Sequence, residues 1–402
     1  MGTELMGSSQ KKNIETIAGK NRIIESIIDA IVTHDHFLLL GHKNPDEDCM
    51  ASLVGLAIIL SKFSKATTIY LGAAIARQYQ YLLNICKFNS ITVTNGASAQ
   101  TDPVEVIAIL DTPKPSMIDA SPEVLSLFAD PKVIKIEIDH HIGSDGAYCG
   151  DEAYSLVTDA SSAAELVGHL ALKLHNKRKL LADHQIDELF SRNLVLSLLT
   201  GIIGDSNMGQ FLKSSREKRY YEIFSSMFNL MLTKETTKES NFANMNDIHR
   251  ELTTLSGQEE SCYRYMIGRK RRSSSIGYVV LTKDDMRKLY SRYDNDMVVA
   301  ASRTVVDALA EESGALGLVA YYDNPKASGL VQFRMRRSRL FKDLDLRAVL
   351  SQLAIADGGG HEGAIGFRFP SSQIADIRRY VRALVPKIEE MLVATREAHQ
   401  VQ

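Results

Sequence analysis

The chain has 402 residues, more than one ordinary domain needs, so two domains are the natural expectation. Hydrophobic residues make up 45% and charged residues 24%, a composition that excludes a disordered chain and is typical of a globular protein. The formal net charge of -2 provides no global field for a long polyanion, so we expect a small charged substrate and no long nucleic-acid partner.

Cysteine usage and the N-terminal residues indicate a cellular location. The four cysteines lie far apart without a C-x-x-C pair, which argues against a zinc ribbon or a disulfide framework and fits a reducing cytosol. The first residues have no apolar signal core, and no apolar run approaches the ~18 residues of a membrane span. We therefore expect a cytoplasmic protein without membrane association, and residues 1–19 to be an N-terminal tail.

Residues 20–205 are predicted to form an α/β domain built on a parallel sheet. Isoleucines at helical spacing predict a helix over 19–34, and apolar runs rich in β-formers then alternate with helical stretches. Continuous apolar strands separated by helices are typical of a parallel sheet that is covered on both faces. The predicted strands are 37–41, 67–71, 104–110 and 133–138.

A second, smaller α/β domain is predicted over residues 262–395. Residues 162–260 have mostly helical patterns, and we expect 206–261 to form a helical linker between the domains. The elements predicted after the linker are a strand at 276–282, a helix at 297–312, strands at 315–322 and 328–336, a helix near 346–355, a strand at 364–369 and a helix at 371–394.

Polar clusters follow three of the predicted strands. The sequence GHKNPDED, residues 41–48, follows the first strand, Asp111 follows the third, and Asp139-His140-His141 follows the fourth. Helix capping explains an aspartate at position 46 but does not predict that such clusters recur at neighbouring strand ends. Parallel α/β sheets bind ligands outside the carboxyl ends of their strands, so we expect a single site there.

The residue types in these clusters suit divalent metal ions. Carboxylates and neutral imidazoles are typical ligands of manganese and similar ions. Four aspartates and two histidines suffice for two ions if one carboxylate bridges them. Two ions about 3.5–4 Å apart can clamp a phosphoryl group and generate hydroxide near neutral pH.

Together these motifs resemble those of the DHH phosphoesterase family, in order and spacing, over most of the chain. GHKNPDED resembles the first family motif, LDT at 110–112 the second, DHH at 139–141 the third, and TGIIGD at 200–205 the fourth. GGGHEGAIGF at 358–367 resembles the signature of the C-terminal DHH-associated domain.

The resemblance implies two divalent ions, with Mn2+ preferred, and a role for each matching residue. His141 would face the scissile phosphate, and Asp139 would orient the histidine pair. Asp111 would be the bridging carboxylate. The metal ligands that the resemblance implies are His42, Asp46, Asp48, Asp111, His140 and Asp205, the first two on one ion.

Two positions depart from the family pattern. Glu47 stands where a small residue is common between the two aspartates, so its carboxylate could crowd or tune the site. Asp205 is followed by Ser-Asn-Met-Gly rather than Thr-Gly, which keeps the ligand but puts the local loop geometry in doubt.

The glycine run Gly358-Gly359-Gly360 with His361 permits two interpretations. It can be a flexible turn between a helix and a strand. Alternatively, the missing side chains let backbone N–H groups approach a phosphate or base, and His361 adds a donor. The family pattern favours substrate binding.

Arginines on the predicted strand 328–336 are candidate phosphate ligands, because guanidinium groups bind phosphate through two hydrogen bonds. In the nanoRNA-degrading branch of the family, a similar strand ends in Arg-Ser and binds the terminal phosphate of the substrate. Arg336 aligns best with that arginine, and Arg334 replaces a small residue. Arg337-Ser338 is the alternative, one residue out of register.

We therefore expect a metal-dependent phosphodiesterase that hydrolyses short 5'-phosphorylated oligonucleotides or linear dinucleotides in a cleft between the domains. Cyclic di-AMP and 3'-phosphoadenosine 5'-phosphate are alternative substrates. A pyrophosphatase is disfavoured because the pyrophosphatases of the family lack the glycine-rich histidine signature. A nucleotide-sensing module is disfavoured because all six ligand positions are filled. The sequence leaves the oligomeric state open, with a homodimer as one possibility.

Overall fold

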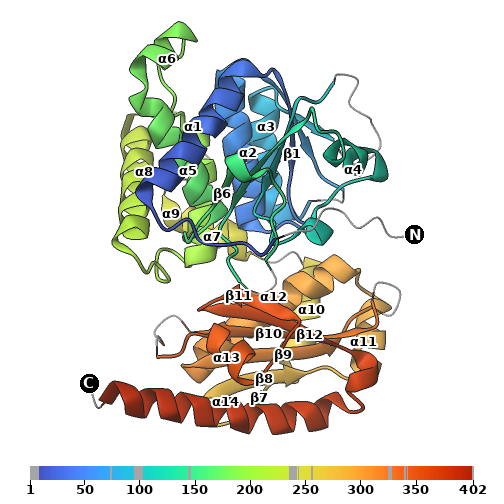
Figure 1. The fold of residues 1–402 in the computed structure, drawn as a ribbon. Coiled ribbons are helices and arrows are strands. Elements are labelled where there is room, and N and C mark those ends of the chain that lie inside the picture. Colours follow the sequence, from blue (N-terminus) through green and yellow to red (C-terminus); the bar gives the residue numbers. More distant parts are fainter. Residues whose placement is uncertain are drawn as a thin grey trace. The chain divides into compact units, whose positions relative to one another are not determined.

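Two compact units make up the computed structural model of the chain, Met1–Thr254 and Leu255–Gln402. Each unit has its own sheet and its own hydrophobic core (Figure 1). The structure describes residues 9–72, 75–94, 103–143, 146–234, 242, 244–254, 257–324, 328–338, 341 and 343–400.

The first unit is a six-stranded sheet with helices packed on it. Its strands are β1 (His36–Leu40), β2 (Ala66–Tyr70), β3 (Thr92–Thr94), β4 (Val106–Leu110), β5 (Ile134–Asp139) and β6 (Ser155–Val157). Its helices are α1 (Ile17–Thr33), α2 (Glu47–Lys62), α3 (Gln80–Phe88), α4 (Pro122–Phe128), α5 (Ala163–Asn176), α6 (Arg178–Asp183), α7 (Arg192–Ser206), α8 (Ser215–Lys234) and α9 (Met245–Thr253).

The order of the strands reverses at the centre of this sheet. The spatial order is β3-β2-β1-β4-β5-β6, and every neighbouring pair is parallel. The chain adds strands to one side of β1 and then, from β4 onward, to the other side. In open α/β sheets, ligands bind outside the carboxyl ends of the strands at such a reversal. The ends of β1 and β4 are therefore the expected position of a site.

Both faces of the sheet are buried, which explains why its strands have continuous apolar runs. Phe37 and Leu39 of β1 belong to the larger core, together with residues of α1, α2, α5 and α7. Leu38 and Leu40 belong to a smaller cluster on the opposite face, against which residues of α4 pack. The α/β class with a parallel sheet, predicted from the sequence, is confirmed.

Two segments differ from the expected tail and linker. Lys11 is only 2% exposed and α1 already begins at Ile17, so residues 9–19 belong to the folded unit. Phe224 of α8 and Ile248 of α9 are buried in the first core, whereas Cys262 belongs to the second. The described helices of this stretch, α8 and α9, thus complete the first unit with their apolar side chains.

The second unit is a mixed sheet in the order β11-β12-β10-β9-β8-β7, in which only β8 and β9 pair in parallel among the described strands. Its strands are β7 (Arg271–Arg272), β8 (Ile276–Val280), β9 (Leu316–Tyr322), β10 (Leu330–Arg337), β11 (Gly358–His361) and β12 (Ala364–Pro370). Its helices are α10 (Gly257–Ile267), α11 (Lys283–Tyr290), α12 (Asn295–Ser313), α13 (Arg347–Gln352) and α14 (Ile377–Gln400).

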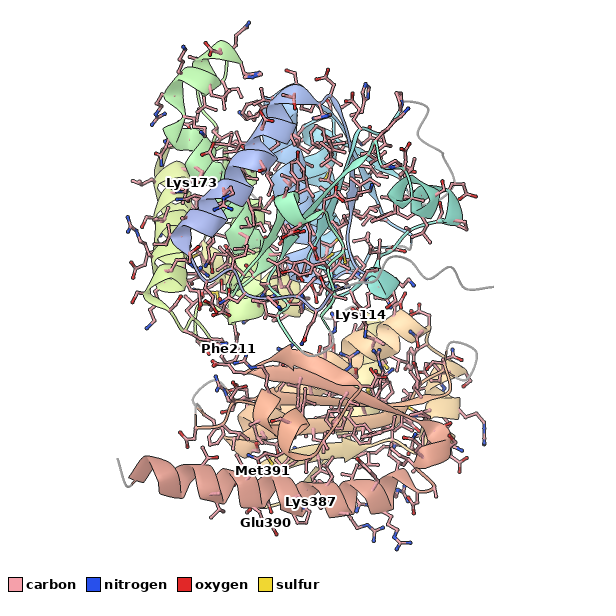
Figure 2. The ribbon with its side chains drawn as sticks, in the orientation of Figure 1. Lys114, Lys173, Phe211, Lys387, Glu390 and Met391 are labelled. Atoms are coloured by element: carbon pink, nitrogen blue, oxygen red, sulfur yellow. The ribbon has the colours of Figure 1, made fainter. Side chains whose placement is uncertain are left out.

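The long helix α14 is amphipathic. Val381, Leu384 and Ile388 are buried in the second core, and Lys387 and Glu390 are exposed (Figure 2). This pattern is typical of a helix that covers one face of a sheet. Across the described ranges, no helix combines the length and the apolar character that crossing a membrane requires.

Candidate metal centre

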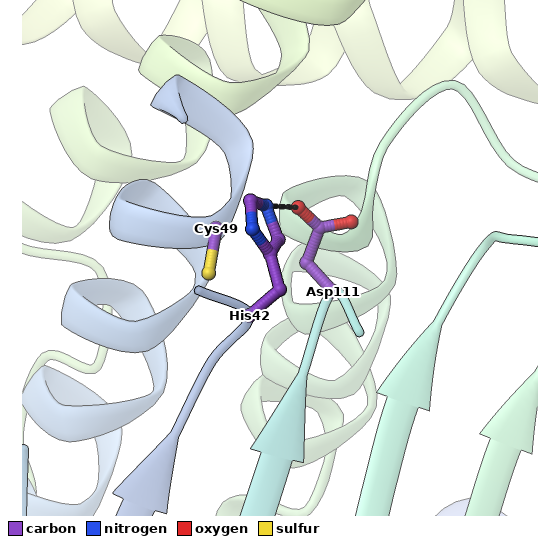
Figure 3. Close-up of side chains that lie close together, drawn as sticks. All are labelled: His42, Cys49 and Asp111. Atoms are coloured by element: carbon purple, nitrogen blue, oxygen red, sulfur yellow. Dashed lines mark ion pairs between the residues drawn. The ribbon is translucent and has the colours of Figure 1, made fainter. Parts of the chain in front are cut away.

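His42 and Asp111 meet at the ends of β1 and β4, where the strand order reverses. Asp111 has a left-handed backbone, with φ of 49°, which aspartate adopts more readily than most residues. Its Oδ2 lies 3.7 Å from His42 Nε2 (Figure 3). That separation is too long for a hydrogen bond. Two atoms that bind the same ion at about 2.1 Å each lie roughly 3.0–3.4 Å from one another. The distance between Asp111 Oδ2 and His42 Nε2 is close to this value.

The second oxygen of Asp111 faces a second histidine. Asp111 Oδ1 lies 3.4 Å from His140 Nε2, and it accepts no hydrogen bond from any described residue. His140 Nε2 is also 3.4 Å from Asp205 Oδ2 and 3.7 Å from Asp48 Oδ2. Asp111 thus presents one oxygen to each of two imidazoles, as a carboxylate that bridges two cations does.

Both imidazoles are oriented by backbone carbonyl groups. His42 Nδ1 lies 2.8 Å from the carbonyl oxygen of Lys43, and His140 Nδ1 lies 3.2 Å from that of Ala160. Because a carbonyl only accepts, each Nδ1 must carry a proton and donate it. Each Nε2 therefore faces the carboxylates, and this is the usual arrangement of a metal-binding histidine.

Without a cation, protons balance part of the negative charge. Burial alone would lower the pKa of His42, but Asp46 and Asp111 raise it to about 9. Burial also works against a charged His140, yet Asp111, Asp205 and Asp48 raise its pKa well above the ordinary value. A bound cation would replace these protons.

The first turn of α2 supplies two aspartates, and each also caps a helix. Asp46 is the N-cap of α2: its Oδ1 accepts from Cys49 N at 3.3 Å and lies 3.6 Å from His42 Nε2. Asp48 is 1% exposed and accepts from the N–H groups of Ala163 and Ala164, at 2.6 and 2.9 Å, at the start of α5. Capping and metal binding are therefore compatible here, because each carboxylate has lone pairs for both.

Close packing of α7 against α2 allows Asp205 to approach the site. A Cβ atom on Gly201 would lie 2.5 Å from Asp48 Oδ1 and 2.5 Å from the Cβ atom of Ala164. Only glycine fits there without displacing a neighbour. Asp205, one turn further along α7, then lies beside His140.

Glu47 and Cys49 are the two neighbours whose roles the sequence did not establish. Glu47 Oε2 accepts a hydrogen bond from the Tyr79 hydroxyl at 3.0 Å. The buried Cys49 thiol lies with His42 and Asp111 in one group of potential ligands, all within 4.8 Å of one another (Figure 3). Burial, with Asp111 and Asp46, raises the pKa of this thiol well above its ordinary value. The carboxylates are therefore the better donors for an oxygen-preferring ion.

Asp139 and His141 form a hydrogen-bonded pair beside the candidate ligands. His141 Nδ1 lies 2.8 Å from Asp139 Oδ1, and the other oxygen of Asp139 accepts from the ammonium group of Lys11. Burial would raise the pKa of the Asp139 carboxyl, but Lys11 and His141 hold it well below its usual range. Asp139 is therefore charged. The sequence analysis missed Lys11, because no local pattern connects residue 11 to residue 139.

Packing accounts for two of the three glycines that were predicted to bind substrate. Gly358-Gly359-Gly360 forms β11 and pairs with β12, rather than forming a turn. A Cβ atom on Gly358 would lie 2.7 Å from Phe367 Cβ, and one on Gly360, with φ of 137°, would lie 2.2 Å from the Ala364 carbonyl oxygen. The side chain of His361 lies outside the described residues. Substrate binding by this segment stays a prediction.

Two of the three arginines of β10 are partly exposed, and the third is buried. Arg336 is part-exposed and lies 3.4 Å from Asp307 Oδ1, and Arg334 Nε donates to the Tyr321 hydroxyl at 3.4 Å. Arg337 is 5% exposed and pairs with Glu362 at 3.1 Å. Arg336 and Arg334 therefore lie on the accessible face. Arg337, the alternative candidate, is buried inside the unit.

Comparison with known proteins supports this interpretation of the first unit. Residues 36–202 match the DHH family, N-terminal domain, and the match includes the motifs from His42 to His141. The chain carries a DHH family domain. This assignment supports a metal-dependent phosphoesterase.

Similarity to solved structures concerns the fold. An exopolyphosphatase-related protein from Bacteroides fragilis is similar at a TM-score of 0.60 and 16% identity, over 94% of this chain and 98% of that one. A pGpG-specific phosphodiesterase, PggH from Vibrio cholerae, is similar at a TM-score of 0.34 and 13% identity, over 89% and 99%. The second resemblance is too distant to bear on the fold or the site.

One relative is similar in sequence over part of its length. A membrane protein–large ribosomal subunit bL9 fusion protein of Onion yellows phytoplasma is 26% identical over 164 residues, which is 38% of this chain. The matched stretch spans only 19% of that protein.

Replacing Asp111 by alanine removes the carboxylate that faces both histidines. We expect the number of Mn2+ ions bound per chain to fall from two to one or none, because each ion loses an oxygen ligand. Isothermal titration with Mn2+ measures this number. Asp183→Ala, an exposed position on α6, is the control and should keep both ions. Two ions retained in Asp111→Ala would show that it does not bridge.

The raised pKa of His42 makes stability depend on pH. Its contribution to stability is fully present below the unfolded-state pKa of 6.5 and is lost as pH rises through about 9. We expect the unfolding temperature of the metal-free protein to fall over this range. Mn2+ should raise that temperature more at about pH 8.5 than at pH 6.5, because the ion displaces protons at low pH. Calorimetry at both pH values tests this, and an equal or opposite difference would contradict it.

Gly201→Ala should lower the free energy of unfolding by about 1–3 kcal/mol, because the added methyl group overpacks the contact between α2 and α7. Gly55→Ala is the matched control, since its Cβ atom would meet Leu198 Cδ2 at an ordinary 3.4 Å. Urea unfolding measures both variants. Equal stabilities would mean that the close approach at Gly201 is not required.

Proposed function

We propose that this protein is a binuclear metal-dependent phosphodiesterase that hydrolyses short 5'-phosphorylated oligonucleotides or linear dinucleotides to mononucleotides. The observation that carries the proposal is Asp111, whose two oxygens face the Nε2 atoms of two histidines with fixed Nδ1 protons. The DHH family domain is consistent with it.

Charge balance supports two ions rather than one. The carboxylates assigned as ligands carry four negative charges, which two divalent cations would neutralise and one would leave half uncompensated. We assign His42 and Asp46 to one ion and share Asp111 between the two. Manganese suits this set of carboxylates and imidazoles. The ligands assigned to the second ion are Asp48, His140 and Asp205.

Two divalent ions held by these residues would polarise a phosphoryl group and would supply a nucleophile near neutral pH. The role we assign to His141 is to contact the substrate. Its Nδ1 donates to the charged Asp139, which fixes the plane of the ring. Nε2, on the opposite side of the ring, then faces away from Asp139 and is available to contact the substrate.

The second unit would supply selectivity for short substrates. We propose that Arg336, with Arg334 beside it, binds the terminal phosphate while the ions engage the scissile one. Simultaneous binding of both phosphates would set the length of a good substrate. Cyclic di-AMP, 3'-phosphoadenosine 5'-phosphate and pyrophosphate require the same metal ligands, so a substrate panel distinguishes these alternatives.

The panel contains linear di-adenylate, a 5'-phosphorylated pentanucleotide, a 20-mer and the three alternative substrates, each with Mn2+. We expect the dinucleotide and the pentanucleotide to be hydrolysed fastest, and the 20-mer to be a poor substrate because its terminal and scissile phosphates do not fit together. Release of mononucleotides, followed by chromatography, measures the rates. Equal rates on the 20-mer and the dinucleotide would rule out selection by length.

Arg336→Ala tests the phosphate ligand directly. We expect kcat/KM on the dinucleotide to fall about 10- to 100-fold, the effect of losing one hydrogen bond to a charged group, with both ions still bound. Arg287→Ala is the control, because this exposed arginine of α11 pairs with Asp284 of the same helix at 3.1 Å. An unchanged kcat/KM in Arg336→Ala would remove it from the site.

A further inference from the structure

The N-terminal segment from Ser9 to Ile14 is bound to the chain that follows the DHH motif. The N–H of Tyr148 donates to the Ser9 carbonyl at 3.2 Å, and the N–H of Lys11 donates to the Gly146 carbonyl at 3.0 Å. Ile14 N then bonds to the Val157 carbonyl at 3.3 Å, at the end of β6. These bonds fix the backbone on both sides of Lys11 and allow its side chain to enter the interior.

The ammonium group of Lys11 lies among three oxygen atoms. Its side chain is completely buried, and Nζ donates to the Thr112 carbonyl at 2.6 Å and to Asp139 Oδ2. Nζ also lies 2.8 Å from Glu137 Oε1. Burial would lower the pKa of this ammonium, but Asp139 and Glu137 hold it above its ordinary value. Lys11 is therefore a buried cation with two hydrogen-bond acceptors, Thr112 and Asp139, and an ion pair to Glu137.

Lys11 compensates the charge of two buried carboxylates on β5. Glu137 and Asp139 are two residues apart on the strand, so both side chains point to the same face, and both are fully buried. Glu137 is fixed from its other side, because its Oε2 accepts from Cys149 N at 2.9 Å and Gly150 N at 3.0 Å. Two buried like charges require a cation between them. Lys11 provides it.

We propose that Lys11 is a positioning residue for catalysis, which holds the Asp139 carboxylate in place so that Asp139 Oδ1 fixes the ring of His141. This inference rests on the proposed function, in which His141 contacts the phosphate. It also makes the N-terminal segment a working part of the site, although the segment lies outside the residues 36–202 that match the DHH family domain.

Loss of the ammonium group would act on His141 through Asp139. Without Lys11, Asp139 would lose the hydrogen bond to its second oxygen and would turn away from the buried Glu137. It would then no longer be a fixed acceptor for His141 Nδ1. Among the described residues, no hydrogen bond or ion pair joins the Lys11 side chain to any of the six assigned metal ligands, so metal binding should persist.

The experiment compares Lys11→Met with a matched control, Lys12→Met, whose side chain is exposed one residue further along. Lys11→Met leaves two buried carboxylates uncompensated and can fail to fold, so Lys11→Met/Glu137→Gln, which removes one of them, is made in parallel. For each variant we would measure kcat and KM on the best substrate, Mn2+ affinity by titration, and the His141 ring nitrogens by 15N NMR.

In the Lys11 variants that fold, we expect kcat to fall about 100-fold, the scale of one well-placed catalytic group, with KM and Mn2+ affinity little changed. The NMR signal of a protonated, hydrogen-bonded His141 Nδ1 should be lost. Lys12→Met should match the wild type in all measurements. This separation of kcat from metal affinity would not result from a purely structural role.

Three results would overturn the proposal: wild-type kcat in the double variant, an unchanged His141 ring, or a loss of kcat that only follows a loss of Mn2+ affinity. Failure of the proposed function is distinguishable from these results. If the wild type hydrolyses no substrate in the panel, the His141 ring state and the Mn2+ affinity still test Lys11, because neither measurement requires a substrate.

Discussion

Repulsion between buried carboxylates is the constraint on which the rest of the first unit depends. Asp48, Asp111, Glu137 and Asp139 are each at most 2% exposed. Asp111 and Asp139 lie at the ends of β4 and β5, Glu137 lies within β5, and Asp48 lies in the first turn of α2. A buried charge is costly unless it is paired and hydrogen-bonded. The structure pairs Glu137 and Asp139 with Lys11, and the N–H groups at the start of α5 stabilise Asp48. Asp111 Oδ1 accepts no hydrogen bond from a described residue, and it is the position at which we propose a cation.

Sheet topology brings these charges together. Because the strand order reverses between β1 and β4, the residues that follow these two strands become neighbours although about 70 residues separate them. Gly201 allows α7 to pack close to α2, and α7 then places Asp205 beside His140. The buried parallel sheet therefore provides rigidity, and the short segments after its strands provide the chemistry.

Much of this could be predicted from the sequence. The strands 37–41, 104–110 and 133–138 fall within two residues of β1, β4 and β5, because continuous apolar runs are a strong signal for buried strands. The polar residues that follow them could be assigned to one edge of the sheet from the same pattern. Their convergence on Asp111 follows from the order of the strands, which the sequence does not reveal.

Other features could not be predicted, for physical reasons. The contact of Lys11 with Asp139 joins residues 128 apart, and local periodicity carries no information on such a pair. The same holds for the hydrogen bond from Ala163 N, at the start of α5, to Asp48, because 115 residues separate the two. The glycines at 358 and 360 favour a turn when considered alone, yet strand pairing with β12 requires their small size. In each case a contact between residues far apart in the sequence determines the local structure, and local preference does not reveal it.

The central claim is that Asp111 joins two metal ions, one beside His42 and one beside His140. Diffraction from crystals grown with Mn2+, recorded at the manganese absorption edge, tests it most directly. The account predicts two anomalous peaks about 3.5–4 Å apart, with one oxygen of Asp111 bound to each. A single peak, or two peaks of which only one contacts Asp111, would contradict it.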